Sequence, residues 1–290
     1  MPAPPNVFAG PYLDRIAHLR KDEAFVAEAL RGTKVRFVPV HESRILVQRG
    51  LDSWSAAYAT SVDLGRLPSL AAEPVLDPMG RSWLSQPATS VNVYPQASVP
   101  PAAAPTGAAT LKVRARYSAK MIALHLEWAD DKPARDRAVG AFADGAAVQW
   151  PVHYGSSAEL PYIGMGHGDA PVALWFWRGD GSVETLAAEG FGTLTRQSPD
   201  GVKARGVWKD GKWYVVFTRT LAAAGEHRVS MAPAKLGLVP VAFAVWRGDA
   251  AERNGLKRLS AWQVLRFEKG KVDTAYANQL AEIAVIGDAG

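Results

Sequence analysis

Short segments in which apolar and polar residues alternate recur through the second half of the chain. Residues 111–117 (LKVRARY) place apolar side chains between basic ones, and residues 121–128 alternate again after a Ser-Ala-Lys turn. This pattern predicts a hairpin of two strands with one solvent-facing side. A second hairpin is predicted where residues 207–208 and 213–219 flank an Asp-Gly turn.

Apolar runs without alternation predict further, more deeply buried strands at residues 146–151, 172–177, 238–246 and 260–267. Glycine and aspartate turns separate them, and few helical patterns intervene. This arrangement favours a mainly β fold, an antiparallel β-sandwich with few short helices. Residues 48–110 are rich in Pro, Ala and Ser, which predicts only short edge strands there.

The two ends of the chain have different patterns. Residues 1–47 combine an amphipathic helical segment with two short strands and predict a small α/β appendage. The wording LDRIAHLRKDEAF resembles the N-terminal portion of Nudix NADH pyrophosphatases, but the glutamate cluster that holds Mg²⁺ in that family does not occur. Residues 271–290 predict a helical tail, so the expected division is 1–47, 48–270 and 271–290.

Composition narrows the function classes. The chain of 290 residues is 48% hydrophobic and 21% charged, which is typical of a globular protein. Its net charge of +5 comes from scattered basic residues, so no nucleic-acid surface is expected, and no apolar run approaches the ~20 residues of a membrane span. The absence of cysteine excludes disulfides, thiolate metal sites, Fe–S clusters and covalent haem attachment.

Tryptophan is abundant: nine of the ten tryptophans follow residue 80. A tryptophan-rich β domain is typical of proteins that bind flat ligands such as sugars or porphyrins, or of an aromatic core.

A methionine between two glycines, Gly164-Met165-Gly166, precedes the apolar run at 172–177. Glycine lets the backbone approach a large flat group, and a thioether is a neutral donor of the kind that binds haem iron. The alternative is a methionine that packs inward from a loop, which is common.

Lys257 follows a polar loop and comes just before a predicted strand that contains Trp262. By itself, a lysine in this position is more typical of the solvated surface.

Five phrases resemble, in order, the haem b-binding gamma subunit of the type II DMSO-reductase family, the group of ethylbenzene dehydrogenase, dimethylsulfide dehydrogenase, selenate reductase and chlorate reductase. The resemblance covers roughly residues 54–265. The phrases are LHLEWADD (124–131), FADGAAVQWP (142–151), the Gly-Met-Gly turn with PVALWFW (164–177), WKDGKWYVVFTR (208–219) and VAFAVWRGDAAERNGLKRLSAW (241–262).

The resemblance implies a site and a fold. Haem b would lie between the sheets of a DOMON/CBM9-like sandwich, with Met165 and Lys257 as iron ligands and Gly164, Gly166 and Trp246 around the cofactor. The lysine would bind iron only as the neutral amine, which requires apolar surroundings that lower its pKa.

Other residues near the two ligand segments leave alternatives open. His153 and His167 compete as ligands, because histidine is the commoner haem ligand. Arg178, Arg247 and Arg253 could pair with haem propionates or lie in solvent. His18, His41, His125 and His227 are expected to have no role.

The implied function is non-catalytic electron transfer between a molybdopterin catalytic subunit with its Fe–S subunit and a soluble c-type cytochrome. The family implies the periplasm, although no export signal is recognised in MPAPPNVFAG. The ending IGDAG resembles the lead-in to a cytochrome c domain. The rival from another class is a carbohydrate-binding module, which predicts several exposed, coplanar tryptophan rings.

Overall fold

The computed structural model describes residues 63–67, 76–96, 107, 109–135, 140–277 and 280. The expected appendage at 1–47 and most of the tail after 277 lie outside these residues, and so do the predicted division of the chain and the ending IGDAG. Residues 274–277 are helical, which agrees with the beginning of the predicted tail. Among the described residues, no helix has the length and apolar character needed to cross a bilayer.

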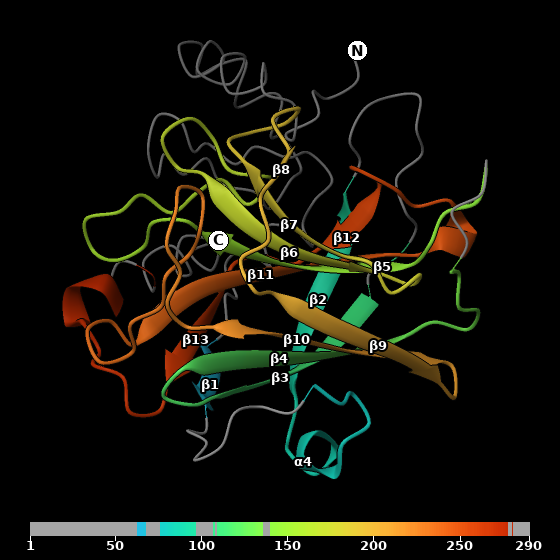
Figure 1. Ribbon diagram of the computed structural model, residues 1–290, viewed down its shortest axis with the longest axis horizontal. Coiled ribbons are helices and arrows are strands. Elements are labelled where there is room, and N and C mark those ends of the chain that lie inside the picture. The colour runs from blue at the N-terminus through green and yellow to red at the C-terminus, as the bar shows by residue number, and fades with distance from the viewer. Residues whose placement is uncertain are drawn as a thin grey trace, which may run out of the picture.

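The described strands form two facing layers (Figure 1). The first layer, sheet I, contains β2 (Thr89–Gln96), β3 (Ala109–Tyr117), β4 (Met121–Ala129), β10 (Lys212–Thr220) and β9 (Lys203–Lys209). The second, sheet II, contains β12 (Lys257–Leu259), β11 (Leu238–Trp246), β5 (Gly145–Pro151), β6 (Val172–Arg178), β7 (Val183–Ala188) and β8 (Thr195–Arg196).

Strand β2 joins the two layers, because residues 89–93 pair with β3 and residues 94–96 pair with β12. Beside β11 lies β13 (Gln263–Phe267), which also pairs with β1 (Asp63–Leu67). The β1–β13 pair is parallel, whereas the other described pairs are antiparallel. The predicted antiparallel sandwich is therefore confirmed.

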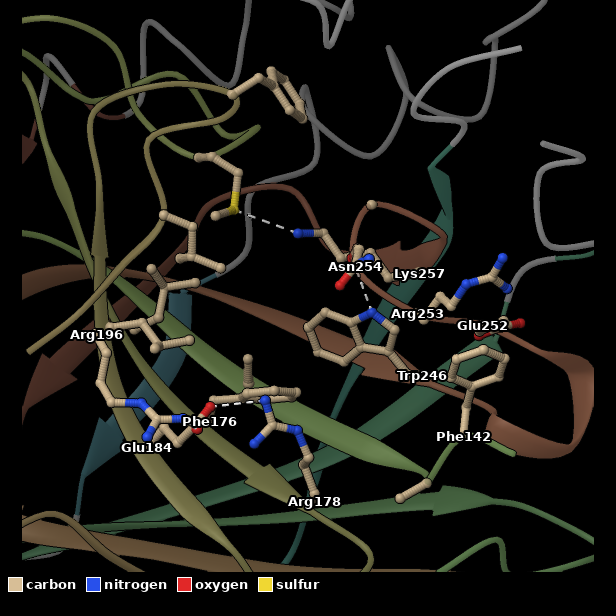
Figure 2. Close-up of a pocket in the computed structure, with 18 of the residues that line it drawn as sticks. Phe142, Phe176, Arg178, Glu184, Arg196, Trp246, Glu252, Arg253, Asn254 and Lys257 are labelled. Carbon is tan, nitrogen blue, oxygen red and sulfur yellow. Dashed lines mark hydrogen bonds and ion pairs between the residues drawn. The ribbon is translucent and has the colours of Figure 1, made fainter. Parts of the chain in front are cut away.

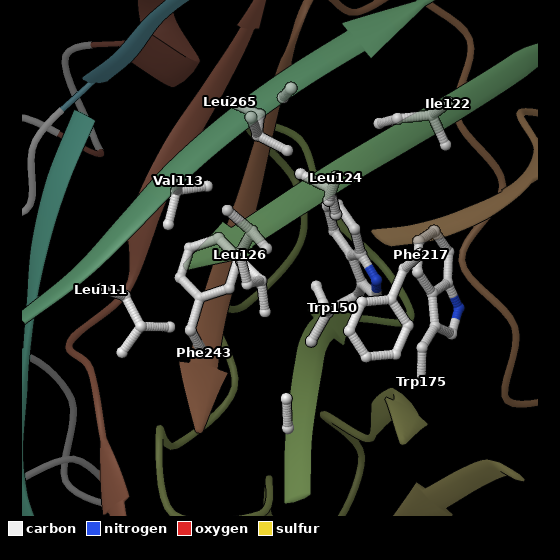
Figure 3. Close-up of a cluster of buried hydrophobic side chains, with 14 of the residues drawn as sticks. Leu111, Val113, Ile122, Leu124, Leu126, Trp150, Trp175, Phe217, Phe243 and Leu265 are labelled. Atoms are coloured by element: carbon white, nitrogen blue, oxygen red, sulfur yellow. The ribbon is translucent and has the colours of Figure 1, made fainter. Parts of the chain in front are cut away.

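The main hydrophobic core fills the space between the sheets (Figure 3). Leu124 and Phe217 come from sheet I, whereas Trp150, Trp175 and Phe243 come from sheet II. These five side chains are fully buried. Packed side chains therefore occupy the place where the resemblance put the cofactor.

Besides the helical residues 274–277, the described residues contain two short helices, α4 (Arg81–Leu84) and η1 (Gly248–Ala250). Helix α4 brings Trp83 onto the outer face of β4, where the indole stacks on His125 at 5.5 Å between ring centroids. This cover explains why β4 is buried on both faces, although its alternation predicts one solvent-facing side. The neighbouring strand β3 keeps the predicted alternation.

Two strand predictions are wrong in detail, and strand β7 was not predicted. Strand β2 is an interior strand, not a short edge strand, because β12 supplies the partner that the apolar pattern does not reveal. The run 260–267 is divided: Lys257 begins β12, and Trp262 lies in the connection before β13. Strand β7 has no sequence prediction, since VETLAA is short and lacks a clear alternation.

Candidate functional site

A cavity of about 840 Å³ lies on the outer face of sheet II, away from the main core (Figure 2). Alternate residues of β6 explain this placement, because Trp175 and Trp177 face the core whereas Leu174 and Phe176 line the cavity. The walls are mostly apolar, with aromatic rings from Phe142, Phe176, Phe191 and Trp246 and aliphatic side chains from Leu174, Leu186 and Leu194. The cavity therefore lies on the other side of sheet II from the space between the sheets, where the resemblance placed the cofactor.

Met165 reaches the cavity from a strained turn. Its φ of 82° is in the left-handed region, which costs a non-glycine residue about 1–3 kcal/mol and persists only where the surroundings enforce it. Two backbone bonds hold the turn: Gly166 N–H donates to the Tyr162 carbonyl at 2.8 Å, and Gly190 N–H donates to the Met165 carbonyl at 2.9 Å. These bonds hold the strained turn in the conformation in which the Met165 side chain lines the cavity.

The two flanking glycines serve the turn rather than the cavity wall. Gly166 has a φ of 74°, and a Cβ there would lie 2.9 Å from the Ala170 carbonyl oxygen. Gly164 is buried in the same turn, and neither glycine lines the cavity. Both were expected beside a cofactor, and their observed contribution is to the backbone conformation.

Lys257 faces Met165 from the opposite wall. Its backbone begins β12 and pairs with Gln96, and its side chain is buried. The amine Nζ donates to Met165 Sδ at 3.5 Å, as the dashed line in Figure 2 shows, and lies 5.4 Å from the centre of the Trp246 ring. Burial without a carboxylate partner lowers the pKa of Lys257 from 10.5 to about 8.

Trp246 forms the floor beside the lysine. Its indole Nε1 donates to the Asn254 carbonyl at 3.0 Å, and its ring packs on Phe176 with 5.0 Å between centroids. The first contact ties the end of β11 to the loop that leads to Lys257. Trp246 thus lines the cavity, and it also fixes the segment that carries the amine.

Charged side chains gather at one part of the cavity wall. Arg178 pairs with Glu184 at 2.7 Å and stacks over Phe176 at 4.4 Å, and Arg196 pairs with the same carboxylate. The Nη1 atom of Arg178 is buried and has no hydrogen-bond partner among the described residues. Arg178 therefore lines the cavity with one buried donor atom left unsatisfied by the described residues.

The remaining arginines divide between wall and surface. Arg253 lines the cavity and stacks over Phe142 at 4.5 Å. Arg247 does not line it, because its guanidinium pairs with Asp249 at 3.0 Å. The sequence did not predict that Phe142, Phe176 and Glu184 line the cavity. Alternation along β6 could have placed Phe176 on the opposite face from the core-facing tryptophans.

The competing histidines lie outside the cavity. The His167 Nδ1 accepts from the Tyr162 N–H at 3.1 Å, and its Nε2 lies 3.3 Å from Glu159. His153 is exposed and lines a different hollow. Among the described residues, no histidine lines the cavity that contains Met165 and Lys257.

Comparisons with known proteins place the chain among several relatives. A candidate heme subunit of a respiratory nitrate reductase from Haloferax mediterranei is 36% identical over 227 residues, covering 75% of this chain and 79% of that protein. The chlorate reductase subunit gamma of Ideonella dechloratans is 33% identical over 210 residues, covering 70% of this chain and 84% of that protein.

Among solved structures, a family 9 carbohydrate binding module from Caldicellulosiruptor kristjanssonii, in complex with glucose, is 9% identical. The match covers 72% of this chain and 98% of that chain, with a TM-score of 0.39.

The family described as ethylbenzene dehydrogenase matches residues 81–201 and 193–258. These segments contain Met165, Lys257 and every other residue that lines the cavity. The match agrees with the family indicated by the five sequence phrases. The chain therefore belongs to the ethylbenzene dehydrogenase family.

Proposed function

We propose that this chain is an electron-transfer subunit that binds haem b in the cavity, with Met165 and Lys257 as the two iron ligands. The observation that carries the proposal is the pairing of a thioether and an amine on the wall of an aromatic cavity, with 3.5 Å between Sδ and Nζ. The relative from Haloferax mediterranei is named as a heme subunit, which supports the same cofactor here.

The donor chemistry suits iron in a low-dielectric site. An amine binds a metal only when it is unprotonated, and the burial of Lys257 lowers its pKa to about 8. The Met165 thioether is neutral at any pH. Because the two atoms are in contact, accommodating an iron between them requires the flexible lysine stem to withdraw.

The cavity also suits a flat, partly acidic cofactor. Its volume of about 840 Å³ falls in the range of small-molecule sites, and Phe176 and Trp246 offer ring faces for packing. The unpartnered Nη1 of Arg178 can donate to a carboxylate of the cofactor, and Arg253 supplies a second positive charge at the wall.

When bound, haem supplies a one-electron iron couple. Met165 and Lys257 would together hold the iron from the protein side, and neither residue would leave its place for a substrate. Trp246 and Phe176 keep water from the amine through their packed rings. These residues therefore favour electron relay over catalysis by this chain.

The proposed partners follow from the family. The relative from Ideonella dechloratans is named as a gamma subunit of chlorate reductase, an oxidoreductase with several subunits. We infer that this chain likewise passes electrons between a molybdopterin catalytic subunit with its Fe–S subunit and a soluble c-type cytochrome. The periplasm is the compartment that the family suggests.

The carbohydrate-binding alternative receives little support from the described tryptophans. It requires exposed, coplanar rings, whereas eight of the nine tryptophans in the described residues are buried and Trp208 is half-buried. No aromatic platform of that kind is formed by these residues.

The experiment is an absorption spectrum of the full chain purified from cells with ample haem supply, followed by titration of the haem-free protein with haemin. We expect one haem per chain and a low-spin, six-coordinate spectrum in both oxidation states. A colourless protein that also fails to take up haemin would overturn the proposal.

A further inference from the structure

Three carboxylates from different parts of the fold lie close together beside the connection from β11 to β12. Asp130 follows β4 of sheet I, Asp144 precedes β5 of sheet II, and Asp249 lies in η1 after β11. One oxygen of each residue lies within 4.8 Å of the others. The cluster therefore bridges the two sheets at the edge where the loop to Lys257 begins.

Asp144 is held by the backbone and an indole. Its Oδ2 accepts from Ala134 N–H at 2.6 Å and from Trp213 Nε1 at 2.9 Å, while its Oδ1 accepts from Gly248 N–H at 2.8 Å. These donors fix a fully buried carboxylate in one orientation. The position of the Asp144 carboxylate is thus set by its hydrogen bonds to the folded chain.

Asp130 has an unused oxygen. The side chain is 1% exposed, and its Oδ1 accepts from Lys132 N–H at 3.2 Å. The Oδ2 atom is buried and has no hydrogen-bond partner among the described residues. An unpartnered carboxylate oxygen beside a second buried carboxylate is costly unless a positive charge or a proton meets it.

The pKa of Asp130 also indicates that its carboxylate lacks a positively charged partner. Burial, followed by repulsion from Asp144, raises the pKa of Asp130 from 3.8 to about 7. The Arg247 guanidinium near the cluster donates to Asp249 instead, from Nε to Oδ1 at 3.2 Å and from Nη2 to Oδ2 at 3.0 Å. The described positive charges therefore leave Asp130 without a direct partner.

We propose that Asp130, Asp144 and Asp249 bind a divalent cation, specifically Ca²⁺. Three carboxylate oxygens form a hard donor set without nitrogen or sulfur, which Ca²⁺ prefers. Oxygens that lie within 4.8 Å of one another can be spanned by one ion with bonds of about 2.4 Å, which is within the range for Ca²⁺. Asp249 is exposed and gives the ion access from solvent.

The cation would fasten the two sheets at one edge. It would join the end of β4, the start of β5 and η1, the helix from which the chain continues through Glu252 to Lys257. The site is separate from the proposed haem ligands, so its binding can be measured on haem-free protein.

The test uses the full chain, freed of metal with EDTA and transferred to metal-free buffer. Ca²⁺ is titrated while thermal unfolding and binding heat are recorded. Tb³⁺ serves as a second probe, because the Trp213 indole, which is bonded to Asp144, can excite its luminescence. We expect Ca²⁺ to raise Tm, and Tb³⁺ luminescence to fall as Ca²⁺ displaces it.

The variant Asp249→Asn keeps the buried pair intact and is expected to weaken Ca²⁺ binding at least tenfold. Its Tm in EDTA should change little, because the ion pair with Arg247 that it removes is partly exposed. Asp130→Asn is expected to abolish the Ca²⁺-dependent rise in Tm. Asp169→Asn, at an exposed residue outside the cluster, is the matched control and should bind Ca²⁺ as the unaltered chain does. The proposal is overturned if millimolar Ca²⁺ leaves Tm unchanged, or if Asp249→Asn binds Ca²⁺ with unaltered affinity.

Discussion

The Nζ atom of Lys257 lies 3.5 Å from the Sδ atom of Met165, although 92 positions separate the two residues. Their backbones are fixed independently, Met165 by a strained turn and Lys257 by the ladder of β12 with β2. A thioether and an amine are thus brought to one point by different parts of the fold. This relationship is the basis of the predictions about cofactor binding.

Replacement of Lys257 by alanine is expected to convert the low-spin haem spectrum to a high-spin or mixed one, because one axial ligand is removed. Lys235→Ala, at an exposed residue, is the control and should leave the spectrum low-spin. The measurement is the absorption and electron paramagnetic resonance spectrum of the ferric protein. An unchanged spectrum in Lys257→Ala would remove this lysine from the site.

Replacement of Arg178 by glutamine is expected to lower haem affinity about tenfold or more, since a charge-assisted hydrogen bond contributes roughly 1.5–3 kcal/mol. The buried, unpartnered Nη1 of Arg178 motivates this prediction. Arg196→Gln is the matched control, because Arg196 pairs with the same Glu184 but is largely exposed. Haem transfer to apomyoglobin measures the affinity, and equal losses in the two variants would contradict a specific role for Arg178.

Gly166→Ala is expected to destabilise the protein by about 1–3 kcal/mol and to weaken haem binding, because a Cβ at a φ of 74° would meet two backbone carbonyls. These carbonyls belong to Ala170 and Ala188, at 2.9 and 3.1 Å. Gly168→Ala in the same loop also has a positive φ, but its Cβ would meet nothing within 4 Å. Urea unfolding of both variants separates the steric clash from the conformational cost, and equal destabilisation would argue against the clash.

The buried His125 predicts a loss of stability in acid. Its Nε2 lies 3.0 Å from the Pro78 carbonyl and its Nδ1 3.3 Å from Arg114 Nη1, an arrangement that suits the neutral ring with the proton on Nε2. Burial is the main cause that lowers its pKa from 6.5 to about 4; Arg114 lowers it further, while Glu127 and the Pro78 hydrogen bond oppose the shift.

Because the unfolded chain takes up a proton below pH 6.5 and the folded chain does so only near pH 4, stability falls as the pH drops through this window. The expected loss from this group is about 2 kcal/mol at pH 5 and about 3 kcal/mol at pH 4, from 1.36 kcal/mol per pKa unit. His125→Gln can keep both hydrogen bonds without titrating. Urea unfolding of both proteins at pH 7.5, 5 and 4 measures the difference, and parallel curves would refute the assignment.

The sequence patterns locate most of the strands, because turn residues and apolar runs are local signals. The patterns fail where a strand is covered or paired by residues that are distant in the sequence. Strand β4 shows an alternating pattern but is covered on its polar side by Trp83, and β2 gains an interior place from β12. These contacts are formed only in the folded chain, so neither could be predicted from the residues of the strand itself.

The same limit applies to the site. Met165 and Lys257 were identified through the resemblance to the family, and the fold brings them together as that resemblance implies. The side of the sheet was not predictable, because β5 and β11 are buried on both faces and a continuous apolar run does not reveal which face meets the other sheet. The Asp130–Asp144–Asp249 cluster has no local motif, since its members come from three separate connections.

Strand β2 spans both layers, and its last residue, Gln96, is the backbone partner of Lys257. Loss of β2 from the sandwich would therefore remove one of the two strands that hold β12, which carries the amine. Release of a bound cofactor should then coincide with cooperative melting of the whole sandwich, so that colour loss on heating would report global unfolding and not the opening of a single loop.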